Sequence, residues 1–207
     1  MSETLTATTI ESGGANESAR SAIFTNARTA NSFAATPVTD AQLVAVWELA
    51  KWAPTAINSQ PLRVLYVTSA EGRENLARHL SRGNRAKTLA APAVAILAYD
   101  SDFHEQLPLV MPVMAGMRDV LAADDAKRGQ MAQFNATLQA GYFVLAARSL
   151  GLAAGPMAGF DAETLDAEFF SGTSWKSILV VNLGYAAGDS FRDRQPRLEH
   201  SEVIRFI

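Results

Sequence analysis

The segment from about Gln130 to Leu150 constrains the fold of this 207-residue chain more than any other. Apolar side chains recur along it at helical spacing, and Gly151 directly after it provides a helix stop. The residues expected on one face are Met131, Phe134, Leu138, Tyr142, Leu145 and Ser149, with Gln139 and Gly141 between them. We therefore predict a long helix whose apolar face lies at the centre of the core.

The rest of the chain alternates between strand and helix patterns. Branched and aromatic residues favour strands at 62–67, 93–99 and 177–183, with a short strand near 153–156. Helices are expected from the Thr39–Gln42 capping box to Pro54, over 70–80 and over 162–169. The alternation predicts an α/β or α+β sandwich, in which helices cover a sheet, with one domain over residues 19–207.

Two segments depart from this alternation. Residues 1–18 are rich in Ser, Thr, Gly and Glu, and we expect them to form a flexible lead. Between residues 100 and 129, Pro108, Pro112 and Gly116 interrupt the apolar residues, which predicts an excursion of short helices and loops. The excursion is equally compatible with a substrate lid and with an ordinary surface connection.

Several functional classes are excluded by what the sequence lacks. The absence of cysteine removes disulfides, thiolate metal sites, iron–sulfur clusters and thiol nucleophiles. The net charge of −3 and the scattered Lys and Arg residues argue against a nucleic-acid partner. There is no GxGxxG, Walker or GxSxG pattern, and the three histidines lack the spacing of a metal site, so no metal is expected.

The N-terminus has neither the basic start nor the apolar core of a signal peptide, and it is too polar to span a membrane. We therefore expect a soluble cytoplasmic protein with no membrane partner.

Two polar segments near the ends of the chain could bind a phosphate. Arg28 could hold it through two hydrogen bonds, with Thr29 and Asn31 adding neutral ones. Arg194 and Arg197 could supply further cations. The alternatives are an exposed arginine at a helix end and a solvated tail.

Three further polar segments lie next to predicted strands. Between Pro54 and Pro61, the side chains of Thr55, Asn58 and Gln60 could present donors to a ring or sugar chain, or form a simple polar turn. Asn84 and Lys87 belong to the second segment. In the third, Gly155 and Gly159 would let the backbone of Pro156, Met157 and Ala158 approach a planar ligand, or merely connect a strand to a helix.

Read in this order, the segments resemble the nitroreductase superfamily, over a length from about residue 22 to the C-terminus. The resemblance implies a homodimer with a mostly antiparallel sheet flanked by helices, which binds FMN and uses NADPH or NADH to reduce a small molecule. Arg28, Thr29, Arg194 and Arg197 match the positions that hold the FMN phosphate and ribityl chain. Asn31 stands where the family has a second arginine.

The resemblance also implies roles for the other segments. Pro54, Thr55, Asn58 and Gln60 match a loop that reaches the FMN held mainly by the other subunit. Asn84 and Lys87 match the pair that addresses the flavin pyrimidine, where Lys87 would stabilise the anion formed on reduction. Pro156, Met157, Ala158 and Gly159 match the segment at flavin N5, where the backbone N–H of Ala158 or Gly159 would donate. Many nitroreductases have a glutamate in place of Ala158.

Within the superfamily, the sequence most resembles the malonic semialdehyde reductases of pyrimidine breakdown. Runs such as Phe24–Thr29, Lys51–Thr55, Lys87–Pro92 and Gly155–Asp161 carry this likeness. It implies reduction of malonic semialdehyde to 3-hydroxypropanoate, and Arg118 is our candidate for binding the substrate carboxylate. A broad nitroaromatic or quinone reductase and a flavin-binding protein without turnover remain alternatives. No residue is evident as the proton donor, and no fingerprint distinguishes NADH from NADPH.

Overall fold

The computed structural model describes residues 13–207, so most of the predicted lead lies outside the described residues. Helix α1 (Glu17–Arg20) starts inside that lead. Asn16 caps α1 by accepting a hydrogen bond of 2.8 Å from the backbone N–H of Ala19. The last two residues of the predicted lead therefore belong to a helix.

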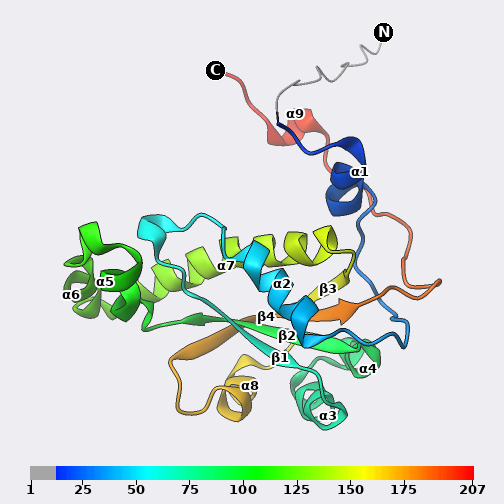
Figure 1. The fold of residues 1–207 in the computed structure, drawn as a ribbon, viewed down its shortest axis with the longest axis horizontal. Coiled ribbons are helices and arrows are strands. Elements are labelled where there is room, and N and C mark those ends of the chain that lie inside the picture. The colour runs from blue at the N-terminus through cyan, green and yellow to red at the C-terminus, as the bar shows by residue number, and fades with distance from the viewer. Residues whose placement is uncertain (1–12) are drawn as a thin grey trace.

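A four-stranded antiparallel sheet lies at the centre of the molecule, with the strand order β1-β2-β4-β3 (Figure 1). The strands are β1 (Leu62–Val67), β2 (Ala93–Asp100), β3 (Ala153–Met157) and β4 (Trp175–Gly184). All four predicted strands are present. β2 lies inside the sheet with both faces covered, which explains why its sequence is an almost unbroken apolar run.

Helices cover both faces of this sheet (Figure 1). One layer contains α2 (Asp40–Ala50) and α7 (Asp125–Ser149), and the other contains α3 (Ala70–His79), α4 (Arg82–Ala90) and α8 (Ala162–Phe169). Alternate residues of each strand enter two separate core clusters, so that Ala95 and Leu97 of β2 pack on the α2–α7 side and Val94 and Ile96 on the other. The predicted class, helices over a mostly antiparallel sheet, is confirmed.

Helix α7 is the long central helix that the sequence predicts, but it buries a different face. Its buried residues are Ala132, Asn135, Ala136, Gln139, Ala140, Phe143, Ala146 and Ala147. Phe134, Leu138 and Tyr142, predicted to face the core, are 66%, 43% and 43% exposed. The prediction of the core face was wrong because the small alanine side chains let the helix lie close against the sheet and α2, while the bulkier stripe remains at the surface.

The predicted excursion is present as a chain of short helices at one end of α7 (Figure 1). These are η3 (Phe103–Gln106), α5 (Leu107–Val110), η4 (Pro112–Met114) and α6 (Met117–Ala122). Phe103, Leu107 and Leu121 pack against Ala132 of α7 in a small core of their own. The excursion ends earlier than predicted, because Asp124 caps α7 by accepting a hydrogen bond from the N–H of Lys127.

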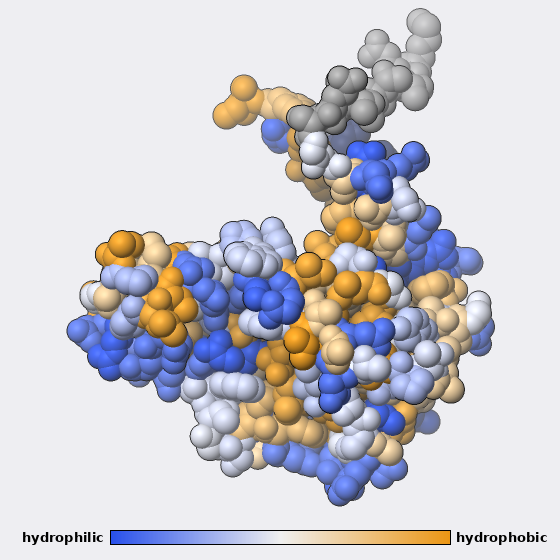
Figure 2. Space-filling view, in the orientation of Figure 1, coloured by the Kyte–Doolittle hydropathy of each residue, from blue (hydrophilic) through white to orange (hydrophobic). Residues whose placement is uncertain are grey.

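After β4 the chain forms an extended C-terminal arm, residues 185–207, which includes α9 (His200–Val203). Together with α1, α9 projects away from the body of the molecule (Figure 1). The π-helix η1 (Ser21–Thr25), which follows α1, contacts α7. Several apolar residues of the arm are exposed, and Figure 2 shows hydrophobic residues at its end. They are Leu198, Val203, Ile204, Phe206 and Ile207.

Candidate functional site

The N-terminal segment that carries Arg28 is held against strand β3. The backbone N–H of Ala30 donates to the carbonyl of Ala154 at 3.3 Å. Gly155 permits this approach, since a Cβ atom at that position would lie only 2.9 Å from the carbonyl oxygen of Ala30. Gly155 therefore permits the close approach of the predicted phosphate-binding segment, whereas its predicted approach to a planar ligand stays a prediction.

Two distant segments, residues 27–31 and 192–197, meet in a cavity of about 360 Å³ that we call the arginine pocket. Arg28 donates from Nη1 to the carbonyl of Arg192 at 3.1 Å, and Arg194 donates to the carbonyls of Thr25 and Ala27. The pocket brings together five residues that the sequence predicts for phosphate binding. They are Arg28, Thr29, Asn31, Arg194 and Arg197.

The arginine pocket is rich in unneutralised cations. Within residues 13–207, none of Arg28, Arg192, Arg194 and Arg197 forms an ion pair with a carboxylate. Asp193 is the acidic residue in the lining. Sequence reasoning missed Arg192, although its place at the start of the basic run 192–197 could have indicated it. An anionic ligand would offset this concentration of positive charge.

Lys87, on helix α4, is close enough to Arg192 to feel its charge. Its pKa is lowered by burial and also by the positive charge of Arg192. An ammonium group under such conditions gains more from an added anion than an exposed lysine does. The structure therefore brings the predicted Lys87 and the arginine pocket into one electrostatic neighbourhood.

The predicted Asn84 segment meets the end of β3. Asn84 donates from Nδ2 to the carbonyl of Gly159 at 3.0 Å, and the N–H of Ser81 donates to the same carbonyl at 2.9 Å. A Cβ atom at position 159 would lie 2.9 Å from both Asn84 Nδ2 and Ser81 Oγ. Any larger residue at position 159 would therefore force the side chain of Asn84 or Ser81 to shift.

The four residues from Pro156 to Gly159 differ in how far they are exposed to solvent. Ala158 is exposed, whereas Pro156 and Gly159 are half-buried. Met157 is buried in the core on the α3–α8 side, with its sulfur 3.9 Å from Nδ2 of Asn182. Its side chain is therefore committed to the core, and only its backbone is available to a ligand.

The predicted loop from Pro54 to Gln60 lies elsewhere in the same chain. Its Ala56 contacts Asn135 on α7, while Arg148, thirteen residues further along α7, donates to the carbonyl of Ile23 beside the arginine pocket. Thirteen residues of helix span about 20 Å. A single chain therefore does not bring this loop to the arginine pocket.

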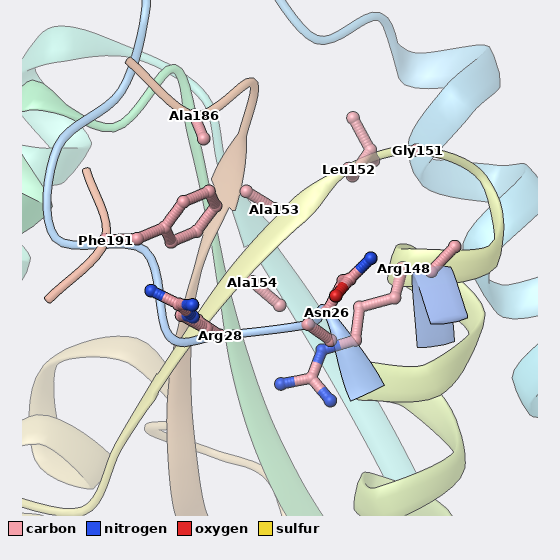
Figure 3. Close-up of a pocket in the computed structure, with 11 residues that line it drawn as sticks. Asn26, Arg28, Arg148, Gly151, Leu152, Ala153, Ala154, Ala186 and Phe191 are labelled. Carbon is pink, nitrogen blue, oxygen red and sulfur yellow. The ribbon is translucent and has the colours of Figure 1, made fainter. Parts of the chain in front are cut away.

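A second cavity, of about 250 Å³, adjoins the arginine pocket and shares Ala27 and Arg28 with it. Figure 3 shows the side chains of Arg28, Arg148 and Phe191 around it. Burial lowers the pKa of the Arg148 guanidinium. The cavity therefore extends the positive surface from the N-terminal segment to the C-terminal end of α7.

Arg118, the predicted carboxylate-binding residue, lies on α6 in the excursion. It donates to both carboxylate oxygens of Glu105, at 2.7 and 3.0 Å, and to Asp119 at 2.7 Å. These hydrogen bonds raise its pKa. In this conformation two carboxylates use three of the five guanidinium N–H donors, so the charge of Arg118 is already neutralised by residues of its own chain.

Known proteins resemble this chain over most of its length. The sequence profile described as the nitroreductase family matches residues 25–185. This chain belongs to the nitroreductase family. A Streptomyces coelicolor protein named as an NADH dehydrogenase/NAD(P)H nitroreductase is 57% identical over 186 residues, covering 90% of this chain and 92% of the relative. A Leptothrix cholodnii protein of similar name is 51% identical over 177 residues, covering 86% and 90%.

Solved structures of the nitroreductase family share the fold. A family member from Streptococcus pneumoniae superposes with a TM-score of 0.79 at 21% identity, covering 89% of this chain and 98% of its own. A nitroreductase from Exiguobacterium sibiricum, solved in complex with FMN, also has a TM-score of 0.79, at 18% identity over 89% and 95% of the two chains. These superpositions confirm the predicted fold.

The described residues of this chain contain neither a side-chain group suited to a metal ion nor a helix suited to span a membrane. No group of three or more His, Cys, Asp or Glu side chains in residues 13–207 is placed to hold a metal ion. None of the helices in that range has both the length and the apolar character needed to cross a bilayer.

Proposed function

We propose that this nitroreductase-family chain is an FMN-dependent NAD(P)H oxidoreductase. The observation that carries the proposal is the arginine pocket, where Arg28 meets the 192–197 segment beside Lys87. The names of the Streptomyces and Leptothrix relatives, which include NAD(P)H nitroreductase, and the FMN complex of the Exiguobacterium protein support it.

The donor set of the described chain fits FMN. Arg28, Arg194 and Arg197 would bind the terminal phosphate, because guanidinium groups match its charge and its planar pairs of acceptors. Thr29 and Asn31 would donate to the ribityl chain, and Arg192 would take a share of the phosphate charge. The absence of a second arginine at position 31 is thus offset by three arginines from the C-terminal arm.

The ring of the cofactor would lie between α4 and the end of β3. Asn84 and Lys87 would address its pyrimidine edge, and the backbone of Ala158 and Gly159 would approach N5. When bound, FMN would supply the redox chemistry by accepting a hydride from NAD(P)H and giving it to an oxidised substrate. The protein positions the ring, neutralises charge through Lys87 and keeps the reacting face accessible at Ala158.

We further propose that the active unit is a homodimer, with the Pro54–Gln60 loop reaching the FMN of the partner subunit. Two observations support this. The loop lies about 20 Å along α7 from the arginine pocket of its own chain. In addition, Phe134, Leu138 and Tyr142 form an exposed apolar stripe on α7, of the kind that a second copy would cover.

For the physiological substrate we propose malonic semialdehyde. The reaction would consume NAD(P)H, a proton and the aldehyde and form NAD(P)⁺ and 3-hydroxypropanoate, since hydride adds to the carbonyl carbon and the proton to its oxygen. The subgroup resemblance supports this choice. Arg118 would bind the carboxylate after exchanging one of its two acidic partners.

A second candidate, a reductase of nitroaromatics or quinones, is supported by the pairing of Arg118. A neutral electron acceptor needs no free cation, and Arg118 is bonded to Glu105 and Asp119. The NAD(P)H nitroreductase names of the relatives point in the same direction.

The visible spectrum of the purified protein tests the proposed function. We expect a yellow protein with stoichiometric FMN that bleaches when NADPH or NADH is added under nitrogen. Reoxidation by malonic semialdehyde would support the specific substrate, and reoxidation only by nitrofurazone or a quinone would support the second candidate. A protein that binds FMN but does not bleach would be a non-catalytic flavoprotein, and a colourless protein that refuses added FMN would overturn the proposal.

A further inference from the structure

The loop that precedes β1 has an unusual backbone. Ile57, Asn58 and Gln60 have φ angles of 49°, 51° and 44°. These angles lie in the left-handed region, which residues other than glycine rarely adopt. β-branched Ile57 is the most unfavourable of the three. Such a backbone conformation is stable only when surrounding groups bond to it or pack on it. The hydrogen bonds of the loop therefore show which residues stabilise it.

Some of these contacts lie within the loop or reach the excursion. Thr55 Oγ1 accepts a hydrogen bond of 3.2 Å from the N–H of Gln60. Gln60 donates to Asn58 Oδ1 at 2.9 Å, and Asn58 donates to the carbonyl of Val110 at 2.7 Å. These bonds involve exposed or half-buried groups with which water can compete.

The contacts from α7 are different, because their acceptor side chains are buried. Oδ1 of Asn135 accepts a hydrogen bond of 2.7 Å from the N–H of Ala56, where the loop begins to turn. Oε1 of Gln139 accepts one of 2.9 Å from the N–H of Leu62, where β1 begins. Asn135 and Gln139 are four residues apart on α7, hence on one face, and are 2% and 0% exposed. One helix face therefore binds both ends of the loop.

Packing of α7 against the sheet does not by itself require these two amides. The neighbouring buried positions of α7 are occupied by Ala132, Ala136 and Ala140, so small apolar residues suit this face. Nε2 of Gln139 is buried without a hydrogen-bond partner among the described residues, which costs free energy. Among the described residues, the Gln139 side chain therefore makes its hydrogen bond through the acceptor oxygen alone.

We propose that Asn135 and Gln139 are positioning residues, which hold the Pro54–Gln60 loop in the strained conformation that presents Thr55, Asn58 and Gln60 to the cofactor. The inference rests on the proposed function, because it assumes that this loop contacts FMN. Helix α7 also carries the exposed stripe at Phe134 and Leu138, where the partner subunit is proposed to pack. The same helix would therefore position the loop relative to the FMN of that partner.

Three variants test the role. Asn135→Leu removes the acceptor for Ala56, and Gln139→Met removes the acceptor for Leu62. The third variant, Phe143→Leu, is the matched control, because Phe143 is buried on the same helix but makes no hydrogen bond to the loop. FMN affinity and Tm are measured for each, and amide exchange is measured in the apoprotein.

We expect Asn135→Leu and Gln139→Met to weaken FMN binding about tenfold or more, the effect of one lost buried hydrogen bond. Amide exchange should rise at Ala56 in Asn135→Leu and at Leu62 in Gln139→Met. Phe143→Leu should lower Tm while changing the FMN affinity less than about twofold.

If wild-type protein binds FMN and the two variants bind it equally well despite faster amide exchange, the positioning role is overturned and the proposed function stands. The positioning role is also overturned if Phe143→Leu loses as much FMN affinity as they do at equal Tm. If the wild-type protein itself refuses FMN, both proposals fall.

Discussion

Asn84 on helix α4 donates a hydrogen bond of 3.0 Å to the carbonyl of Gly159, directly after strand β3. The two residues are 75 positions apart in the sequence, yet they belong to the two segments proposed to hold the ring of the cofactor. The contact joins the pyrimidine side of the proposed site to its N5 side. The relative placement of these segments is thus a property of a single chain and needs no contribution from a partner.

Replacing Gly159 with alanine should disturb this contact between α4 and the residues that follow β3. The new Cβ would meet Asn84 Nδ2 and Ser81 Oγ at 2.9 Å, so α4 must shift or Asn84 must give up its hydrogen bond. We expect FMN affinity to fall about tenfold, with a stability loss of about 1–2 kcal/mol. Gly83→Ala is the control, since nothing lies within 4 Å of a Cβ there. Equal FMN affinity in the two variants, measured by flavin fluorescence, would contradict this account.

Gly155→Ala should disturb the segment around Arg28, which is proposed to bind the FMN phosphate. Its Cβ would lie 2.9 Å from the backbone oxygen of Ala30, which cannot rotate away as a side chain can. We expect a loss of about 1–3 kcal/mol of stability and a displaced Arg28 segment with weaker FMN binding. Thermal unfolding and FMN titration measure both effects, with Gly129→Ala, an open position within α7, as the reference. An unchanged Tm for Gly155→Ala would be the contrary result.

The affinity for reduced FMN should depend on pH through Lys87. Burial and Arg192 lower the pKa of this lysine in the free protein, and the anionic pyrimidine edge of the reduced ring would raise that pKa. Binding then takes up a proton in the window between the two values, so affinity falls as the pH rises through it. Titrations from about pH 7 to about pH 10 should show the decline in wild-type protein and a weaker one in Lys87→Arg, whose charge persists. A flat wild-type profile would exclude Lys87 from the site.

The arginine pocket should recognise the phosphate rather than the flavin ring. Arg197→Ala should cost about 1.5–3 kcal/mol in FMN binding, the range for hydrogen bonds to charged groups. Riboflavin, which lacks the phosphate, should bind the variant and the wild type alike. Lys127→Ala, at the opposite end of α7, serves as the charge control. Equal losses for FMN and riboflavin would show that Arg197 acts on something other than phosphate.

The exposed stripe of α7 provides a test of the proposed dimer. Phe134→Glu combined with Leu138→Glu places charges on an exposed surface, so a monomer should fold normally. Sedimentation should then show dissociation, and FMN affinity should drop because the partner's loop is lost. Glu163→Lys on α8, in the opposite helix layer, should change neither property. A double variant that sediments like wild type would argue against an interface at this stripe.

Local patterns predicted the strands and most helices correctly. The capping box at Thr39 and Gln42 is present with both of its hydrogen bonds, and the apolar run of β2 is the interior strand. Helix α4 was missed because its residues are mostly polar, and they resemble a loop unless a neighbouring element covers one side. It lies between α3 and β2 in the chain and packs on α3, which stabilises it in a way that no local pattern reveals.

The four strands, the longer helices other than α4, and the side chains able to bind a phosphate followed from the sequence alone, because helical spacing, strand composition and side-chain chemistry are local properties. The expectation of a flavin came from the resemblance to a family. Tertiary packing selected the stripe of α7 that meets the sheet, since both stripes have helical spacing and only the close packing of alanines distinguishes them. It also brought Arg28 to Arg192 across 164 residues and placed the Pro54–Gln60 loop far from them. Convergence of that kind depends on how the layers pack, which is a property of the whole chain.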